Sequence, residues 1–180
     1  MRNQFFLLIF FLLIFFANPV KSQEVTWYSF EEALELNKQE PRKIMVDLYT
    51  NWCGWCTKMD KLTFSHPEVA RYLNKYYYPV KLNAETRDTI KYFNRLWVNN
   101  STGRRPTHQL AYAIGVYKKR LSYPTIVFMN EENKVITPWP GFQKPEDLLP
   151  LLHYFANDIY LSRRNFYEWK KNYQQNGKKD

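Results

Sequence analysis

The feature that most constrains this chain is a pair of cysteines directly after a mostly apolar run. Cys53 and Cys56 are the only two cysteines in the sequence of 180 residues. They follow the run 43–49, which has the pattern of a buried central strand. So close a pair excludes the disulfide framework of a small secreted domain. On the chain-entropy estimate, a disulfide that closes so short a ring stabilises the fold by only about 2 kcal/mol. A purely structural disulfide therefore explains the pair poorly.

The composition indicates one ordinary globular domain. Hydrophobic residues make up 45% of the sequence and charged residues 24%, which excludes global disorder and a collagen-like structure. The chain is also long enough to bury a sizeable core.

The N-terminal segment has the pattern of a secretory signal peptide. Arg2 gives it a positively charged start, Phe5–Ala17 is an unbroken apolar run, and residues 20–22 offer a cleavage site. As a helix the apolar run would extend about 20 Å, which is short of the roughly 30 Å hydrocarbon core of a bilayer. We therefore expect residues 1–22 to be removed and the protein to be periplasmic or secreted. An uncleaved membrane anchor is the alternative.

Hydrophobic periodicity predicts alternating helices and strands along the rest of the chain. Their order implies an α/β fold, with a mixed central sheet flanked by helices on both faces. The predicted elements, in chain order, are a helix at 27–37, a strand at 43–49, a helix beginning near the cysteines, a helix opened by a capping box at Ser65–Glu68, a strand at 77–82, a short helix at 108–115, strands at 126–129 and 134–137, and a long helix from residue 144.

Residues 84–107 form an inserted excursion between two of these elements. Their apolar residues recur at helical spacing and predict one amphipathic helix. These residues are Ile90, Phe93, Leu96 and Trp97. Two interpretations stay open: the insert either covers or extends the substrate groove and so forms part of the functional surface, or it is only an addition to the surface of the domain.

Residues 163–180 form a basic C-terminal tail in which Phe166, Tyr167 and Trp169 are interleaved with lysine and arginine. The whole chain carries a net charge of +9 at pH 7, and removal of residues 1–22 with their two basic residues leaves +7, which suits anionic partners. We expect the tail to be a solvated, partly frayed helix, with contact to an anionic membrane surface or an acidic partner as the alternative. Nucleic acid is not expected as a partner of an exported protein.

A Cys-x-x-Cys motif at the start of a helix has a specific chemical use. The unpaired backbone N–H groups and the dipole of the helix stabilise an anion there, so Cys53 can be a thiolate near neutral pH. Cys56 lies one turn further on and is expected to be more buried and less reactive. Cys53 would attack a substrate disulfide, and Cys56 would then attack Cys53 and release the reduced product.

Two other interpretations of the cysteines compete with redox chemistry. A structural zinc site needs about four ligands, and beyond the cysteines only histidines could supply them. The histidines, none at a metal-like spacing, are His66, His108 and His153. A purely structural disulfide contributes little because its ring is so short. We therefore predict no metal, and no cofactor other than the redox-active disulfide Cys53–Cys56.

The stretch 46–56 resembles the active-site segment of the thioredoxin superfamily, and the resemblance extends over roughly residues 25–160. The matching positions are Asp47 six residues before the first cysteine, Trp52 immediately before it, Val80–Asn83 with its lysine Lys81, the cis-proline segment Tyr123-Pro124-Thr125, and Gly141 as the late glycine. Together with Lys58, two residues after the second cysteine, the motif is similar to that of exported members. The resemblance implies a thioredoxin fold over residues 23–162, with an inserted helical excursion at about 84–107 and a C-terminal helical extension at 163–180.

The resemblance also implies roles for four of these residues. Cys53 is the attacking thiolate and Cys56 the resolving thiol. Asp47 is a buried carboxylate that exchanges a proton with Cys56. Its pKa is raised by burial and coupled to Lys81.

The other expected site residues surround the cysteines or lie across from them. A cis Pro124 would place the backbone of Tyr123 beside Cys53, where it can pair with an extended substrate peptide. The supporting residues are Trp52, Gly54 and Trp55, and the substrate-binding residues are Tyr123, Pro124 and Thr125. The two tryptophans would form an apolar platform around the site.

The sequence thus predicts an exported thiol–disulfide oxidoreductase that acts on protein thiols and disulfides of the cell envelope. It would exchange electrons with an upstream thiol donor or acceptor. We expect a reductant, because a buried acid and lysine serve deprotonation of the resolving thiol. Trp55 stands where familiar thioredoxins have proline, and the two middle residues strongly affect the reduction potential, so a disulfide oxidase or isomerase is the alternative. A non-catalytic binding or chaperone module and a membrane-anchored electron relay are further alternatives.

Overall fold

The computed structural model describes residues 24–162 and 164–176. The expected signal peptide at 1–22 lies outside the described residues, so its cleavage stays a prediction. Within the described part of the chain, no helix combines the length and the apolar character needed to cross a membrane.

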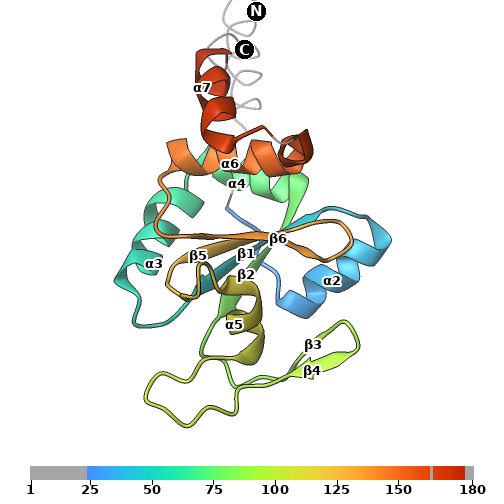
Figure 1. Ribbon diagram of the computed structural model, residues 1–180, viewed down its shortest axis with the longest axis vertical. Coiled ribbons are helices and arrows are strands. Elements are labelled where there is room, and N and C mark those ends of the chain that lie inside the picture. Colours follow the sequence, from blue (N-terminus) through green and yellow to red (C-terminus); the bar gives the residue numbers. More distant parts are fainter. Residues whose placement is uncertain (1–23, 163, 177–180) are drawn as a thin grey trace, which may run out of the picture.

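A mixed sheet of four strands forms the centre of the molecule (Figure 1). Its strand order is β2-β1-β5-β6, with β1 at Lys43–Tyr49, β2 at Tyr77–Asn83, β5 at Thr125–Met129 and β6 at Val135–Pro140. Strand β1 runs parallel to β2 and antiparallel to β5, and β5 runs antiparallel to β6. The mixed sheet predicted from the sequence is therefore confirmed, with the apolar run 43–49 as a central, buried strand.

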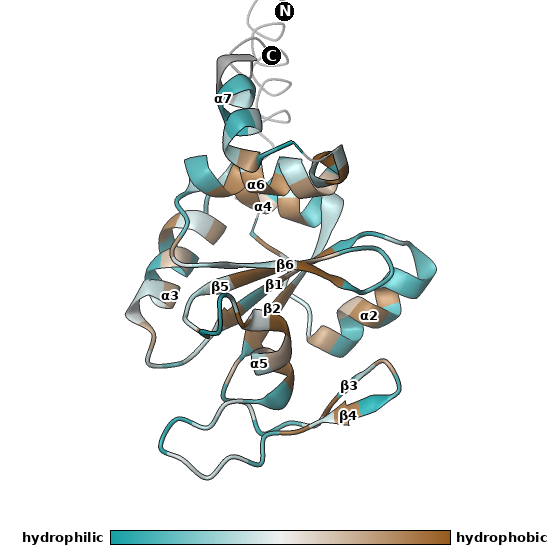
Figure 2. Ribbon diagram, in the orientation of Figure 1, coloured by the Kyte–Doolittle hydropathy of each residue, from teal (hydrophilic) through white to brown (hydrophobic). Residues whose placement is uncertain are grey.

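Helices cover both faces of the sheet, as the sequence predicts. In Figure 1, α4 and α6 lie above the sheet and α2 and α5 lie below it, and Figure 2 shows the hydrophobic residues gathered on the strands between them. The helical elements are α2 (Phe30–Gln39), α3 (Gly54–Met59), the π-helical turn η1 (Asp60–Phe64), α4 (Pro67–Tyr76), α5 (Gln109–Gly115), α6 (Pro145–Ala156), the 3-10 turn η2 (Ile159–Ser162) and α7 (Phe166–Asn176).

Alternate residues of β1 point into two hydrophobic cores. Val46 and Leu48 pack with residues of α2 and α5, whereas Met45 packs with residues of α3, α4 and α6. Asp47 lies two residues after Met45 and therefore points to the same face, where it is fully buried. The central strand thus carries an ionisable group into a core that is otherwise built of apolar side chains.

Helix α4 begins one residue later than its predicted capping box. Its N-cap is His66, which makes no side-chain cap hydrogen bond. The hydroxyl of Ser65 instead donates to the carbonyl of Lys61 at 2.6 Å. The turn η1 runs up to Phe64 and leaves Ser65 in helical backbone conformation, so this serine cannot act as an N-cap.

The insert forms a β-hairpin instead of the predicted amphipathic helix. Strands β3 (Ile90–Tyr92) and β4 (Arg95–Trp97) pair antiparallel and are joined by a turn of two residues. Phe93 in that turn has a φ of 51°, which is the left-handed conformation such a turn requires. Phe93 and Leu96 are 59% and 63% exposed, so the helical spacing of the apolar residues does not correspond to a buried face.

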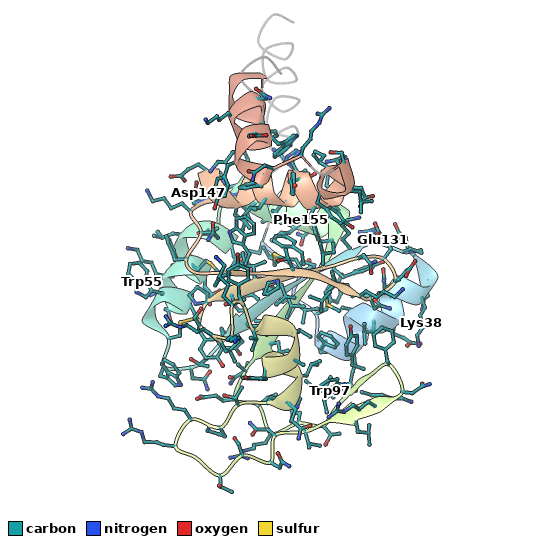
Figure 3. All side chains as sticks on the ribbon, viewed as in Figure 1. Lys38, Trp55, Trp97, Glu131, Asp147 and Phe155 are labelled. Atoms are coloured by element: carbon teal, nitrogen blue, oxygen red, sulfur yellow. A yellow bond between two sulfur atoms is a disulfide. The ribbon has the colours of Figure 1, made fainter. Side chains whose placement is uncertain are left out.

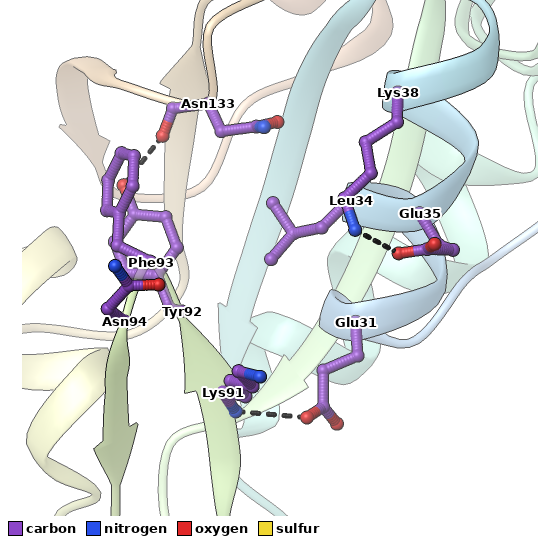
Figure 4. Close-up of a pocket in the computed structure, with 9 residues that line it drawn as sticks. All are labelled: Glu31, Leu34, Glu35, Lys38, Lys91, Tyr92, Phe93, Asn94 and Asn133. Atoms are coloured by element: carbon purple, nitrogen blue, oxygen red, sulfur yellow. Dashed lines mark hydrogen bonds and ion pairs between the residues drawn. The ribbon is translucent and has the colours of Figure 1, made fainter.

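The hairpin packs across α2. The ring of Tyr92 meets Phe30 edge-on with centroids 5.3 Å apart, and the backbone N–H of Lys91 donates to Glu31 Oε1 at 2.9 Å. A pocket of about 510 Å³ lies between α2 and the hairpin (Figure 4). None of the residues that line it is among the expected site residues, so we assign it no role.

The C-terminal helix α7 packs on α6, where the sequence predicts a solvated and partly frayed helix. Phe166 and Trp169 both contact the ring of Tyr154 in α6, at centroid distances of 5.3 and 5.4 Å. Lys170 adds an ion pair with Asp147 at 2.6 Å. The expectation of a solvated helix is therefore wrong for the face of α7 that packs on α6, because the aromatic residues on that face extend the hydrophobic core. Contact of the tail with a membrane surface stays a prediction.

Candidate active site

Cys53 and Cys56 form a disulfide at the N-terminus of α3, with their Cα atoms 5.3 Å apart. Cys53 is the N-cap residue, and its Sγ accepts a hydrogen bond from the backbone N–H of Cys56 at 3.1 Å. Cys53 is 6% exposed and Cys56 is 2% exposed. The first sulfur therefore lies where a helix N-terminus stabilises a thiolate, and the second lies deeper, as the predicted order of reactivity requires.

Two exposed tryptophans flank the disulfide. Trp52 is 49% exposed and Trp55 is 57% exposed. Each contacts another aromatic ring. The ring of Trp52 meets the ring of Tyr123 edge-on at a centroid distance of 6.0 Å. The ring centroids of Trp55 and Phe142 are 5.5 Å apart. We call these four side chains the aromatic rim. Phe142 is a member that the sequence analysis did not single out.

The peptide bond between Tyr123 and Pro124 is cis, as the resemblance implies. The next residue, Thr125, pairs with Leu48, so this turn lies at the end of β1 from which the cysteines follow. The buried hydroxyl of Thr125 donates within the same turn and therefore supports it. Gly141 donates its N–H to the carbonyl of Pro124 at 2.8 Å, and its φ of 97° requires glycine.

Gly54 is the expected site residue for which the structure shows the least constraint. It is exposed in the first turn of α3, and a Cβ added there would meet nothing within 4 Å. Its backbone is not in the left-handed conformation. Neither the space around it nor its backbone therefore demands glycine.

A buried carboxylate on β1 is paired with a lysine from the neighbouring strand. Asp47 and Lys81 are direct partners in the parallel register of β1 and β2, and Lys81 Nζ lies 2.6 Å from Asp47 Oδ2. The same Nζ also contacts the carboxylate of Asp60, which begins η1 one helical turn after Cys56. Lys81 therefore links the buried carboxylate to the helix that carries the cysteines. Asp60 was not predicted, although its spacing of four residues from Cys56 on one helix face is a usable signal.

Burial controls the protonation of this group of charges. It raises the pKa of Asp47 from 3.8 to about 6, although the charge and hydrogen bond of Lys81 act in the opposite direction. The charge of Asp60 raises the pKa of Asp47 further. Burial lowers the pKa of Lys81, but the two carboxylates outweigh it and the net shift is upward. Asp47 Oδ1 accepts no hydrogen bond from any described residue, so this oxygen can take up a proton.

The insert reaches the aromatic rim through two charged side chains. Glu85 Oε1 accepts a hydrogen bond from Trp52 Nε1 at 2.9 Å, and the guanidinium of Arg105 lies 3.9 Å from the centre of the same tryptophan ring. The insert therefore contacts the aromatic rim, and its role as an extension of the functional surface stays a prediction. Sequence analysis missed both residues because contacts between such distant positions leave no local pattern.

His108 and His153 are engaged in contacts within the domain, whereas the buried Nδ1 of His66 has no hydrogen-bond partner among the described residues. His108 is fully buried, and its Nδ1 accepts a hydrogen bond from the backbone N–H of Leu110 at 3.1 Å. The ring of His153 lies 4.0 Å from the ring of Tyr72. Across residues 24–162 and 164–176, no group of three or more histidine, cysteine, aspartate or glutamate side chains is placed to hold a metal ion.

A family model described as a thioredoxin-like domain matches residues 30–156. The chain belongs to the thioredoxin-like family. Membership of this family supports an oxidoreductase, and thioredoxin-like proteins use a redox-active disulfide and need no external cofactor. The disulfide at the start of α3 supplies that group.

Solved structures of thioredoxin-like proteins share this fold. A thioredoxin from Thermus thermophilus is 20% identical, with a TM-score of 0.52 over 72% of this chain and 85% of that one. A thioredoxin-fold protein from Helicobacter pylori is 18% identical, with a TM-score of 0.57 over 74% of this chain and 82% of that one. At these identities the similarity shows the fold alone.

Curated relatives of this thioredoxin-like protein are named thiol:disulfide interchange protein DsbD. The protein from Pectobacterium atrosepticum is 27% identical over 120 residues, which are 66% of this chain and 17% of that protein. The one from Vibrio vulnificus is 37% identical over 46 residues, which are 26% of this chain and 8% of that protein. The chain therefore spans less than a fifth of the length of these relatives.

Replacing Asp60 by asparagine is expected to lower the pKa of Asp47 below about 6. The substitution removes a nearby negative charge and leaves Asp47 as the one carboxylate that pairs with Lys81 among the described residues. Both changes favour the ionised form of Asp47. A carbon NMR titration of the Asp47 carboxyl measures the effect, with Asp88→Asn, an exposed position in the insert, as the control. An unchanged or higher pKa of Asp47 in Asp60→Asn would contradict this coupling.

Proposed function

We propose that this thioredoxin-like protein reduces disulfides of proteins outside the cytoplasm, with Cys53 as the attacking residue and Cys56 as the resolving one. The observation that carries the proposal is the ion pair of Asp47 and Lys81, which Asp60 joins to the helix bearing the disulfide. A buried carboxylate with a pKa of about 6 can accept a proton near neutral pH. Such a group serves the step in which the resolving thiol loses its proton.

The reaction consists of two exchanges that leave the partner with two thiols. The Cys53 thiolate attacks one sulfur of the partner disulfide, which forms a mixed disulfide and releases the partner's other sulfur as a thiolate. Cys56 then loses its proton and attacks Cys53 Sγ, which breaks the mixed disulfide and releases the partner's second thiolate. The partner gains two electrons and takes up two protons. The protein ends in the disulfide form of the present structure, and a thiol donor returns the two electrons.

Asp47 is the proposed acceptor of the Cys56 proton. A cysteine thiol ordinarily has a pKa of about 8.5, so few resolving thiolates exist at neutral pH without a base. With a pKa of about 6, Asp47 is mostly ionised at pH 7 and basic enough to take part in the transfer. Lys81 favours the ionised carboxylate and limits the rise in the pKa of Asp47 that burial causes, whereas the charge of Asp60 acts against Lys81.

Two features support action on partner proteins outside the cytoplasm. Residues 1–22 have the pattern of a secretory signal peptide, and disulfides persist in the compartments that such a signal leads to. The curated relatives are named thiol:disulfide interchange proteins, which supports exchange with thiol and disulfide partners.

The reduction potential of the Cys53–Cys56 couple tests the direction of electron flow. Equilibration with glutathione is expected to give a value at or below roughly −230 mV, towards the thioredoxin value of about −270 mV. A value between about −120 and −180 mV would instead assign the protein as an oxidase or isomerase. The activity itself is measured as reduction of insulin disulfides with a dithiol donor, and an absence of turnover would contradict the proposed function.

A further inference from the structure

Two cations lie against the aromatic rim, one on each tryptophan. The guanidinium of Arg105 lies 3.9 Å from the centre of the Trp52 ring. Lys58 Nζ lies 4.9 Å from the centre of the Trp55 ring and 5.7 Å from that of Phe142. Figure 3 shows Trp55 at the edge of the molecule. The disulfide is therefore bordered by two positive charges, each held on an aromatic ring.

Neither cation is neutralised by an ion pair in residues 24–162 and 164–176. The salt bridges of that part of the chain include neither Arg105 nor Lys58. Glu85 also contacts Trp52, but its carboxylate accepts the N–H at the edge of the ring, whereas Arg105 lies over the face. Both cations therefore keep their charge available to a partner.

The loop that carries Arg105 is fixed in place by a buried polar side chain. Asn99 is 7% exposed, and its Oδ1 accepts a hydrogen bond from the hydroxyl of Ser101 at 3.1 Å. Its side-chain amide donates at 3.0 to 3.3 Å to three carbonyls of the insert, those of Glu85, Thr86 and Pro106. The anchored residues include Glu85, which bonds to Trp52, and Pro106, which follows Arg105. The cation is therefore held at the rim before any partner binds, which lowers the entropic cost of using it.

We propose that the substrate segment taken by this site is acidic, with its disulfide flanked by Asp or Glu side chains that meet Arg105 and Lys58. This inference rests on the proposed function, since the segment is the disulfide substrate. The exposed rings of the aromatic rim supply apolar contact that tolerates many sequences. The two cations add selection for negative charge and speed the encounter with an acidic partner. Without residues 1–22, which contain Arg2 and Lys21 and no acidic residue, the chain keeps 24 basic against 17 acidic residues, and this excess of positive charge acts in the same direction.

The test compares three disulfide peptides that differ only in the residues flanking the disulfide, which are glutamate, glutamine or lysine. The readout is the second-order rate constant with which each peptide oxidises the reduced protein. At low salt the acidic peptide is expected to react about three to five times faster than the neutral one, and the basic peptide more slowly. Raising the salt from about 0.02 M to about 0.5 M should bring the three rates together, because the Debye length shortens.

Charge reversal at the two cations locates the effect. Arg105→Glu is expected to reverse the ratio of acidic to neutral rates, and Lys58→Glu to reduce it. Arg95→Glu is the matched control, because Arg95 belongs to the same insert and stacks on Trp97 at 4.1 Å, away from the aromatic rim. Figure 3 shows Trp97 well separated from Trp55. This control should leave the ratio unchanged.

Three outcomes would overturn the inference. Equal rates of the wild type with the acidic and neutral peptides would contradict the inference of an acidic substrate segment, while the proposed function would stand. An equal loss of preference in Arg95→Glu and Arg105→Glu would show an effect of total charge and not of the rim. If none of the peptides oxidised the reduced protein, the proposed function would fail and the inference with it.

Discussion

Cys53→Ser is expected to lower the rate of disulfide reduction by about a thousandfold or more, whereas Cys56→Ser is expected to block only the second exchange. A serine hydroxyl does not ionise near neutral pH, so it cannot replace the thiolate at the N-terminus of α3. Cys56 is the deeper of the two sulfurs and follows in the second step. The Cys56→Ser variant should therefore attack a partner disulfide and remain joined to it.

The two variants are matched controls for each other. Each removes the same disulfide and with it the same small stabilisation by a short ring, about 2 kcal/mol, so a difference in folding cannot explain a difference in reactivity. Turnover is measured with insulin, and the trapped adduct is measured by mass spectrometry after acid quenching. Full activity of Cys53→Ser would contradict the mechanism. A Cys56→Ser variant that traps no partner would favour a non-catalytic binding module.

The central strand and the disulfide that follows it can be predicted because both leave local signals. The apolar run 43–49 coincides with β1, and the motif of Cys53 and Cys56 coincides with the start of α3. The pairing of Asp47 with Lys81 spans two strands, and it was accessible through the resemblance of both segments to one family. Each of these features depends on residues that are close in sequence or on two segments that resemble the same family.

The insert could not be predicted because its structure depends on distant contacts. A turn of two residues at Phe93 places the apolar side chains at a spacing that also fits a helix. What selects the hairpin is the packing of Tyr92 on Phe30, and no local pattern contains that contact. The stacking of Arg105 on Trp52 is likewise a tertiary contact, and it was invisible in the sequence for the same reason.

Asp47→Asn is expected to stabilise the fold at pH 8 by about 2 to 3 kcal/mol and to have almost no effect at pH 3. The folded protein holds the Asp47 proton with a pKa of about 6, above the ordinary value of 3.8. The folded state therefore binds this proton more tightly than the unfolded state, and stability is lost as the pH rises from about 4 through about 6. Asparagine cannot ionise, so the variant avoids that loss.

Urea unfolding of the wild type and Asp47→Asn at both pH values measures this effect. Asp88→Asn is the control, because it makes the same chemical change at an exposed position and should leave the pH dependence as it is. In Asp47→Asn, Lys81 keeps Asp60 as a partner, so the substitution does not leave the lysine without a carboxylate. Equal stability of the wild type and Asp47→Asn at pH 8 would contradict the raised pKa.

The more stable variant is expected to be the poorer catalyst. Asp47→Asn should lower the rate of disulfide reduction at pH 7 by about a hundredfold, because the amide cannot accept the Cys56 proton. The wild-type rate should rise as the pH passes through about 6, where Asp47 ionises, whereas the variant should follow only the ionisation of the thiols. If Asp47 had a purely structural role, Asp47→Asn would keep the pH dependence of the wild-type rate. A pH–rate profile that is the same in Asp47→Asn and the wild type would therefore assign the proton to another acceptor.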